Sequence, residues 1–445
     1  MFSAIIFVLS ALGVFGMLLA SEKRAFDVIK ISKILAVVYC VIGLFRFLLA
    51  DSFVETALDF SDPLQCIMRW GYYLGYAVIP LSLFFKSPLM RNISLCFTLP
   101  MAVLSAVFFN QTFSYFRAEG AGGVYANEVF VSVYYSTELI LAIVLPIVIT
   151  VITEHIPFKG GYREVLRTLC ALPFMMIIMV PAYIPQAILG YPDISTSSFS
   201  TLHLGWILLL AAAIAVLYFI FRRKSEDEKY ILILFLTVAQ FYHTNSIFLR
   251  GFEWSRLPLQ LCSIAAYFYL FTVLTKKRII FDFCFLVNLV GGLIAIALAD
   301  FGSDSLSFWN IHYIYEHTFV MMVPILAHAL GLFGRLTATS LKNALRIFAI
   351  YFASSFIIGS LINYIANDGY TVNFFYMFNY ETAINYVPFA TFTGLIDFSI
   401  GHFKIYPLLI ITVFVFFNAL FIGFYYLMKL LYRLRDKKAP VSLLV

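Results

Sequence analysis

Uninterrupted apolar runs of about 20 residues, the length that crosses the hydrocarbon core of a bilayer as an α-helix, recur along the whole chain. Only helices and closed barrels satisfy their backbone hydrogen bonds inside a membrane, and these runs lack the alternation of barrel strands. About thirteen such runs lie between residues 2 and 430. The sequence therefore predicts an all-α polytopic membrane protein with about thirteen transmembrane helices.

The composition excludes several other classes of protein. Of the 445 residues, 62% are hydrophobic and 12% are charged, whereas a soluble domain carries about 25% charged residues. The net charge of +6 is spread over small clusters, so the chain lacks the continuous basic face of a nucleic-acid-binding module. The six cysteines show neither a C-x-x-C pair nor a zinc-ligand spacing. We therefore expect no nucleic-acid partner, no metal and no cofactor.

The charges of the loops predict the orientation of the chain. Lys23 and Arg24 follow the first apolar run, the next loop carries Asp59 and Asp62, and basic and acidic loops go on alternating up to a basic C-terminal tail. The exception is the loop 250–256, whose arginines lie on the predicted outer side. Short basic loops stay on the cytoplasmic side of a membrane. We therefore expect an outside N-terminus, an inside C-terminus and an odd number of spans. The expected location is a bacterial cytoplasmic membrane, although the residues do not exclude a eukaryotic endomembrane.

Two pairs of similar segments indicate an internal duplication. Residues 62–66 (DPLQC) and 257–262 (LPLQLC) each open an apolar run that is followed by a basic turn and a second apolar run. Farther along, one Tyr, Glu and Pro pattern occurs twice with identical spacing, as Tyr135, Glu138 and Pro146 and as Tyr313, Glu316 and Pro324. The alternative is chance similarity between apolar helices.

The duplication predicts two tandem halves, 1–195 with about six spans and 196–445 with about seven. An even number of spans separates equivalent segments, so the two copies point the same way and form a parallel repeat. The copies differ where chemistry is expected, because the counterpart of His317 is Leu139 and Cys66 is one residue out of step with Cys262. We therefore predict that the first half is a degenerate copy and that the second half carries the functional site.

Four landmarks in the second half occur in the order found in a known family. They are residues 199–203 (FSTLH), residues 257–262 (LPLQLC), His317 and residues 373–378 (NFFYMF). Over about 198–430 the chain thus resembles the transmembrane protein 164 / YwaF-like integral membrane proteins. It departs from their pattern at Gln260, where the family has a His, and in residues 401–407 (GHFKIYP), which replace a closing G-P-W-P segment.

This resemblance implies a seven-span unit and a membrane-embedded enzyme. Animal members of the family are described as acyltransferases that act on phospholipids, with a Cys and a His as key residues. Carried over to the matching positions, these residues are Cys262 and His317. The resemblance thus implies acyl transfer or acyl hydrolysis, with membrane lipids as partners.

Helix geometry predicts that these two side chains meet. Cys262 lies in the first turn of its helix, about 6 Å below Pro258, and His317 lies about 12 Å along a helix that starts near Trp309. Both helices start on the predicted outer side, so the two side chains have compatible depths. The positive end of a helix dipole favours a thiolate, and a His can act as its base. The alternatives are a packing cysteine and a histidine hydrogen-bonded across helices.

Other polar residues near these helices are expected to support or orient the pair. Glu316 lies one turn from His312, which suggests a structural pair, with orientation of His317 as the alternative. Arginine forks suit lipid phosphates, although interfacial arginines also snorkel without binding a ligand. The expected supporting residues are Gln260, His203 and His243, and the expected lipid head-group residues are Arg250, Arg256 and Asn373.

Two other functions fit the same residues. In a transporter or ion channel, buried Glu316, His312 and His328 would line a pathway across the membrane. In a non-catalytic scaffold, the helices would bind lipid or a partner protein without chemistry. A sulfur–imidazole pair opening towards the outer leaflet favours the enzyme, whereas a continuous polar pathway favours transport.

Overall fold

The computed structural model describes nine stretches of the chain, namely residues 2–23, 27–49, 63–110, 128–179, 199–250, 253–299, 308–366, 372–387 and 389–438. Contacts divide the chain into two compact units. Unit 1 comprises Met1–Ser195, Val238–Phe252 and Phe301–Ile314, and unit 2 comprises Thr196–Thr237, Glu253–Asp300 and Tyr315–Val445. The chain passes from unit 1 to unit 2 between Ser195 and Thr196, and two further segments of the second half also belong to unit 1. The division into two tandem halves stays a prediction.

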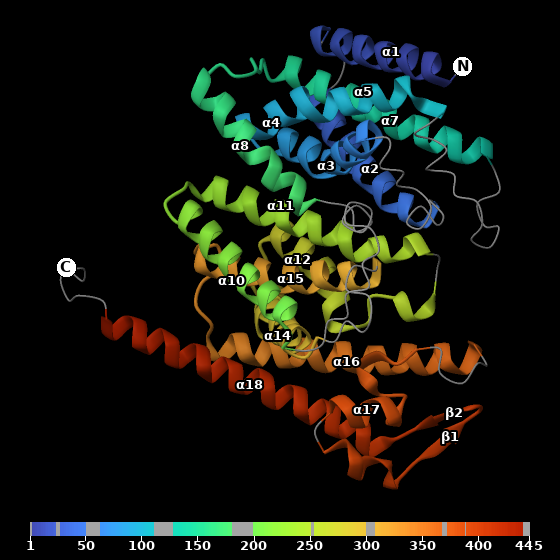
Figure 1. The fold of residues 1–445 in the computed structure, drawn as a ribbon, viewed down its shortest axis with the longest axis vertical. Helices are drawn as coiled ribbons and strands as arrows, with labels where there is room; N and C mark the ends of the chain where they lie inside the picture. Colours follow the sequence, from blue (N-terminus) through green and yellow to red (C-terminus); the bar gives the residue numbers. More distant parts are fainter. Residues whose placement is uncertain are drawn as a thin grey trace. The chain divides into compact units, whose positions relative to one another are not determined.

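The described part of unit 1 is helical (Figure 1). Its elements are α1 (Phe2–Glu22), α2 (Val28–Leu49), α3 (Pro63–Phe84), α4 (Pro88–Ile93), the π-helical turn η1 (Ser94–Thr98), α5 (Leu99–Val107), α7 (Glu128–Ile152) and α8 (Tyr162–Ile178). The end of α11 (Glu226–Asn245), the turn η2 (Ser246–Arg250) and the start of α15 (Phe308–Ala329) complete the unit.

Unit 2 contains the remaining parts of α11 and α15 and most of the second half. Its other elements are α10 (Thr201–Phe221), η3 (Trp254–Arg256), α12 (Leu261–Thr275), α13 (Arg278–Phe283), η4 (Cys284–Asn288), α14 (Leu289–Ala297), α16 (Ala338–Ala366), η5 (Phe374–Tyr376), α17 (Tyr380–Tyr386), η6 (Ala390–Leu395) and α18 (Pro407–Lys438). Strands β1 (Phe398–Ile400) and β2 (Phe403–Ile405) form one antiparallel hairpin.

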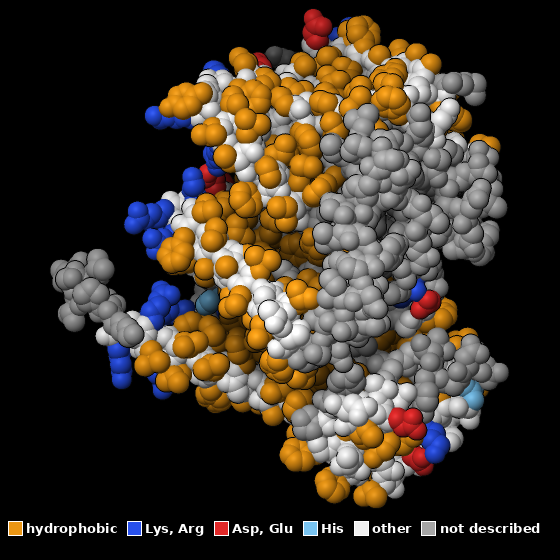
Figure 2. Space-filling model, viewed as in Figure 1, with side chains coloured by type: hydrophobic (Ala, Val, Ile, Leu, Met, Phe, Trp, Pro, Cys, Tyr) orange, Lys and Arg blue, Asp and Glu red, His pale blue; other side chains and the backbone are white. Residues whose placement is uncertain are grey.

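Eight helices among the described residues are long and apolar enough to cross a membrane. The surface of α10 illustrates why they suit a bilayer, because Leu208 and Leu209 expose 69% and 70% of their surface. Figure 2 shows hydrophobic side chains over this helix and over α8. Such a surface is stable only when lipid covers it. The all-α membrane fold is confirmed, whereas the number of thirteen spans and the orientation of the chain stay predictions.

Two stretches of the chain share one unusual segmentation. A helix of 6 residues, a π-helical turn of 5 and a helix of 9 form α4–η1–α5, and the same three lengths form α13–η4–α14. In η1 the hydroxyl of Thr98 donates to the carbonyl oxygen of Ser94 at 2.8 Å. This contact competes with the regular backbone bond of an α-helix. π-Helical turns are rare and frequently lie at functional sites.

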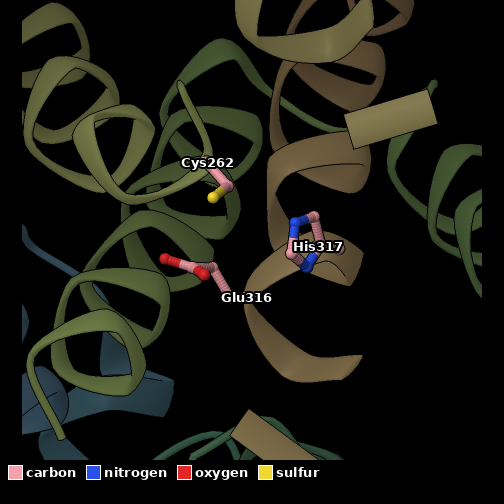
Figure 3. A group of neighbouring side chains, drawn as sticks. All are labelled: Cys262, Glu316 and His317. Atoms are coloured by element: carbon pink, nitrogen blue, oxygen red, sulfur yellow. The ribbon is translucent and has the colours of Figure 1, made fainter. Parts of the chain in front are cut away.

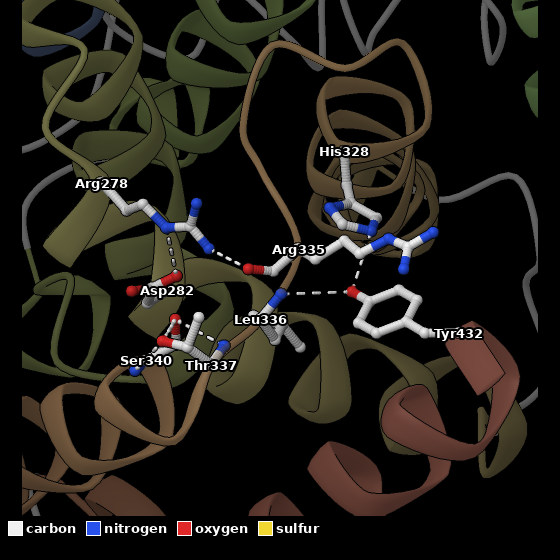
Figure 4. Close-up of polar contacts among 8 residues, drawn as sticks. All are labelled: Arg278, Asp282, His328, Arg335, Leu336, Thr337, Ser340 and Tyr432. Atoms are coloured by element: carbon white, nitrogen blue, oxygen red, sulfur yellow. Dashed lines mark hydrogen bonds and ion pairs between the residues drawn. The ribbon is translucent and has the colours of Figure 1, made fainter. Parts of the chain in front are cut away.

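The turn between α15 and α16 is held by side chains from three helices of unit 2 (Figure 4). Arg278 donates to the carbonyl oxygen of Arg335, and both guanidinium NH₂ groups of Arg335 bind the carboxylate of Asp436 at 2.6 and 2.8 Å. The hydroxyl of Tyr432 lies 3.0 Å from Nε2 of His328. His328, a candidate for an ion pathway in the transporter hypothesis, thus contacts α18 beside this turn.

Candidate functional site

Cys262 is the second residue of α12, where the sequence predicted it. This helix has 15 residues, so it is about 22 Å long, whereas the hydrocarbon core is about 30 Å thick. A helix of this length that ends at one membrane surface starts below the other. Backbone outside a helix is tolerated at such depth only where the protein satisfies its polar groups.

Side chains of α16 satisfy the carbonyl groups that precede α12. The hydroxyl of Tyr351 lies within hydrogen-bond distance of two of them, 3.3 Å from the oxygen of Pro258 and 3.1 Å from that of Gln260. The hydroxyl of Ser355 donates to the oxygen of Leu259 at 3.4 Å. These contacts fix the entry of the chain into α12 and so fix the position of Cys262.

A second support comes from η4. Nδ2 of Asn288, a fully buried residue at the end of this π-helical turn, donates to the carbonyl oxygen of Leu261 at 2.6 Å. Its Oδ1 is buried and has no hydrogen-bond partner among the described residues, so the contact to Leu261 is the one that holds this amide in place. The π-helical turn therefore delivers a polar side chain to the residue next to Cys262.

Glu316 and His317 complete the candidate site from the adjacent helix α15 (Figure 3). Their side chains are 6% and 3% exposed, and Cys262 is half-buried. One ligand atom from each residue, the Cys262 sulfur, a Glu316 carboxylate oxygen and a His317 ring nitrogen, lies within 4.8 Å of the other two. The Cys262 sulfur and the His317 imidazole are therefore close together, as helix geometry predicted.

This arrangement has the composition of a nucleophile, a base and an acidic partner. A weak nucleophile is activated when a base lies beside it and a third group orients the base. The separations exceed a hydrogen bond, as is common at catalytic sites without substrate. The cluster is built from a helix start and from adjacent positions of a second helix, so its parts have little freedom to separate.

The same three atoms also match the donor set of a zinc site. Zinc binds thiolate, imidazole and carboxylate ligands, and catalytic zinc sites combine three protein ligands with water. Neither Glu316 nor His317 forms a recognisable spacing motif with Cys262, which is why the sequence predicted no metal. Zinc would hold the sulfur as a thiolate ligand instead of leaving it as a nucleophile.

Gln260 lies at the start of α12 and binds a distant segment. Its Nε2 donates to the carbonyl oxygen of Asn373 at 3.4 Å, and its Oε1 accepts from the N–H of Phe375 at 3.3 Å. Phe375 and Tyr376 both adopt positive φ angles, of 54° and 61°. Each costs about 1–2 kcal/mol for a residue with a side chain, so the anchoring contacts hold a strained turn.

Asn373 contacts the backbone inside this turn, and its predicted lipid role stays a prediction. Its Oδ1 accepts from the N–H groups of Phe378 and Asn379 at 3.0 and 3.1 Å. Its side-chain acceptor is therefore used by the backbone. The sequence signal, an Asn before aromatic residues, marked a structural position of the segment.

The three predicted supporting histidines have other contacts. In unit 2, Nδ1 of His203 accepts from the N–H of Phe199, and its Nε2 donates to the carbonyl oxygen of Ile296. Both nitrogens of this buried ring therefore form hydrogen bonds with backbone groups. In unit 1, His243 donates to the carbonyl oxygen of Ile178, and His312 lies 3.4 Å from the hydroxyl of Ser246.

Of the two arginines predicted to bind lipid head groups, the structure describes the side chain of Arg256. Arg256 is buried and forms an ion pair with Glu253, so a carboxylate of the protein already binds its guanidinium. The side chain of Arg250 lies outside the described residues. The lipid role of both arginines stays a prediction.

Three residues that support the site were absent from the sequence prediction. Tyr351, Ser355 and Asn288 contact carbonyl groups of residues 258–261. The one sequence signal that indicates these three residues is a polar side chain inside an apolar run, because polar side chains inside a membrane usually form hydrogen bonds or ion pairs. The sequence did not indicate which partners they bind.

The fold and the buried polar cluster define an integral membrane protein with a site built on α12 and α15. The TMEM164 family matches residues 194–426, more than half of the chain. The chain belongs to this family. Comparison with curated proteins and with solved structures found no similar protein. The match covers every residue of the candidate site, and the likeness to YwaF-like proteins stays a prediction.

Proposed function

We propose that the protein transfers or hydrolyses acyl groups of membrane lipids, with Cys262 as the nucleophile and His317 as its base. The observation that carries the proposal is the convergence of sulfur, imidazole and carboxylate within 4.8 Å. Ionisable groups inside a membrane are costly and are usually functional or paired. A structural pair needs two such groups, whereas this cluster brings together three.

In the first step, the Cys262 sulfur attacks the carbonyl carbon of a lipid ester. His317 takes the thiol proton and then delivers it to the leaving alkoxide oxygen, which departs as an alcohol. The carbon–oxygen ester bond breaks and a thioester forms. The Glu316 carboxylate stabilises the imidazolium that exists between the two proton transfers.

In the second step, a hydroxyl group of a second lipid, or water, attacks the thioester. His317 accepts the proton of this hydroxyl and returns it to the departing sulfur, so the enzyme regains its starting protonation state. A lipid acceptor gives acyl transfer, and water gives hydrolysis. The proton exchanges need no group beyond the three side chains.

The half-buried position of Cys262 suits a lipid substrate. An ester carbonyl of a glycerophospholipid lies near the boundary between head groups and acyl chains. If α12, with its 15 residues, ends at one membrane surface, Cys262 at its start lies below the other. The predicted orientation makes this surface the outer one, which assigns the reaction to the outer leaflet.

The decisive experiment looks for the thioester. The purified full chain is incubated in nanodiscs with a phospholipid that carries a fluorescent acyl chain, and labelled protein is then treated with neutral hydroxylamine, which cleaves thioesters. In the wild type, we expect the label on a peptide that contains Cys262, and we expect hydroxylamine to remove it. In Cys262→Ala, we expect no labelled peptide. Cys284→Ala, a buried cysteine outside the cluster, should label as the wild type does.

Unchanged acyl turnover in Cys262→Ala would remove the nucleophile and leave the transporter and scaffold hypotheses. The zinc alternative is tested on the same samples by elemental analysis. One bound zinc that is lost in Cys262→Ala, without a thioester in the wild type, would assign the cluster to metal binding.

We further infer that the two halves are tandem copies and that the first is degenerate. The equal 6, 5 and 9 residue segmentation supports this origin. Glu138, the counterpart of Glu316, is fully buried and accepts a hydrogen bond from Tyr76. A tyrosine therefore binds the carboxylate in unit 1, where unit 2 has Cys262 and His317.

A further inference from the structure

Unit 1 contains a cavity of about 630 Å³ between the start of α4, the turn 153–161 and the first turns of α8. Four of its lining side chains carry a permanent positive charge, and two carry carboxylates, which leaves a surplus of positive charge. The cations are Arg91, Lys159, Arg163 and Arg167, and the carboxylates are Glu154 and Glu164. Neither the candidate site nor the proposed acyl chemistry involves these residues.

The cavity is built on one buried amide. Oδ1 of Asn92, which is fully buried, accepts from Nε2 of His155 at 2.8 Å and from the N–H of Phe158 at 3.4 Å. Its Nδ2 donates to Glu164 at 3.1 Å. The amide thus ties α4, the turn and α8 together, and the cavity exists before any ligand arrives.

Of the two carboxylates that line the cavity, that of Glu164 already binds groups of the protein. One oxygen of Glu164 accepts from Asn92 and the other accepts from the N–H of Gly160 at 2.8 Å. Arg91 uses Nε to bind the carbonyl oxygen of Ser82 at 3.2 Å. This contact leaves its two terminal nitrogens, a fork that suits phosphate oxygens. The start of α8 adds the positive end of a helix dipole.

The cavity lies at the ends of two candidate membrane spans. Pro88–Val107 begins there and Ser132–Ile152 ends there. Beyond the basic first turns of α8, Leu169 and Phe174 expose 61% and 69% of their surface, and Figure 2 shows the hydrophobic covering of this helix. Cationic groups therefore meet an apolar helix face at the boundary between water and hydrocarbon.

We propose that this cavity binds the phosphate-bearing head group of an anionic glycerophospholipid, whose acyl chains lie along α8. The surplus of cations favours an anionic head group over a zwitterionic one, because a quaternary ammonium would face four cations and two carboxylates, one of which, that of Glu164, already binds the protein. The volume is in the range of ligand pockets, about 300–1,000 Å³, and so accommodates more than a bare phosphate. Basic pockets at the membrane ends of helices are suited to such lipids.

The test measures lipid binding to the full chain by native mass spectrometry in a neutral detergent. The probes are a phosphatidylglycerol and a phosphatidylcholine with identical acyl chains. We expect the wild type to prefer phosphatidylglycerol, and the double variant Lys159→Gln, Arg163→Gln to lose this preference. Each removed cation should weaken binding about fivefold. The double variant Arg222→Gln, Arg223→Gln, which alters an exposed basic pair of unit 2, should bind as the wild type does.

Three outcomes would overturn the proposal. They are equal binding of both lipids to the wild type, an equal loss in the control variant, and full competition by inorganic phosphate at the concentration of the lipid. The last outcome would identify a site for free phosphate. Lys159→Arg, Arg163→Lys retains both charges and should keep the preference, which separates loss of charge from loss of folding.

Discussion

The side-chain amide of Gln260 binds the backbone of Asn373 across 113 positions of sequence, with its Nε2 3.4 Å from the carbonyl oxygen. The same amide accepts from the N–H of Phe375. It therefore joins the start of the Cys262 helix to a turn with two positive φ angles.

Gln260→Ala should destabilise the protein because both contacts are lost. Two hydrogen bonds contribute a net of about 1–3 kcal/mol, which should appear as a lower midpoint of thermal unfolding in detergent. Gln260→Glu keeps the acceptor for the N–H of Phe375 and loses only the donor. Its unfolding midpoint should therefore lie between those of the wild type and Gln260→Ala. An alanine variant as stable as the wild type would show that the turn holds its conformation without Gln260.

Tyr351→Phe should disturb the start of α12 while leaving the packing of α16 intact. The half-buried residues Pro258 and Gln260 would lose the hydroxyl that their carbonyl groups share, and the loss of such a hydrogen bond costs about 0.5–1.5 kcal/mol. The rate of maleimide labelling at Cys262 should rise, since the first turn is less restrained. Tyr364→Phe, an exposed tyrosine of the same helix, is the matched control and should change neither stability nor labelling.

Glu316→Gln should slow formation of the proposed thioester while leaving the fold intact. The amide has the shape of the carboxylate but cannot stabilise an imidazolium by charge, and the loss of such a charge costs on the order of 10² or more in rate. The measurement is the rate of labelling of Cys262 by a fluorescent acyl lipid. Glu226→Gln, at an exposed position in the first turn of α11, should label at the wild-type rate. Equal rates in both variants would reduce Glu316 to a structural role.

The sequence predicted the membrane fold and the meeting of Cys262 with His317 because both follow from one-dimensional rules. Apolar length predicts a span, and a rise of about 1.5 Å per residue predicts a depth. Depth alone does not give the angular position of a side chain around its helix. The place of Glu316 in the cluster depends on that angle, and so the sequence predicted a pair with His312 as its main role.

The sequence did not predict the hydrogen-bond partners of the buried polar side chains, for a related reason. His203 and Asn373 were predicted as site residues because they are polar residues in an apolar context. In the structure, both side chains form hydrogen bonds with backbone groups. Which carbonyl or N–H a buried side chain meets depends on contacts between distant segments. The sequence did not predict the cavity beside Asn92, because basic residues between two apolar runs are typical of any cytoplasmic loop under the positive-inside rule.

His155 offers a pH-dependent measure of the lipid cavity. Burial and, after it, the charge of Arg91 lower the pKa of this imidazole, and the charge of Glu164 acts in the opposite direction. The folded protein therefore holds His155 neutral at a pH where the unfolded chain, with a pKa of about 6.5, is protonated. This stabilisation is complete above pH 6.5 and is lost as the pH falls towards the lowered pKa. The charged groups that share the cavity with His155 are Arg91 of α4, Glu154 and Lys159 of the turn, and Arg163, Glu164 and Arg167 of α8.

An anionic head group in this cavity should raise the pKa of His155, because it offsets the charge of the surrounding cations. By linkage, the lipid should bind more tightly as the pH falls towards the lowered pKa of His155 in the lipid-free protein. The measurement is an NMR titration of the His155 ring in nanodiscs of phosphatidylglycerol and of phosphatidylcholine. The pKa should be higher in phosphatidylglycerol for the wild type and equal in both lipids for Lys159→Gln, Arg163→Gln. A wild-type ring that titrates identically in the two lipids would mean that no anion enters the cavity.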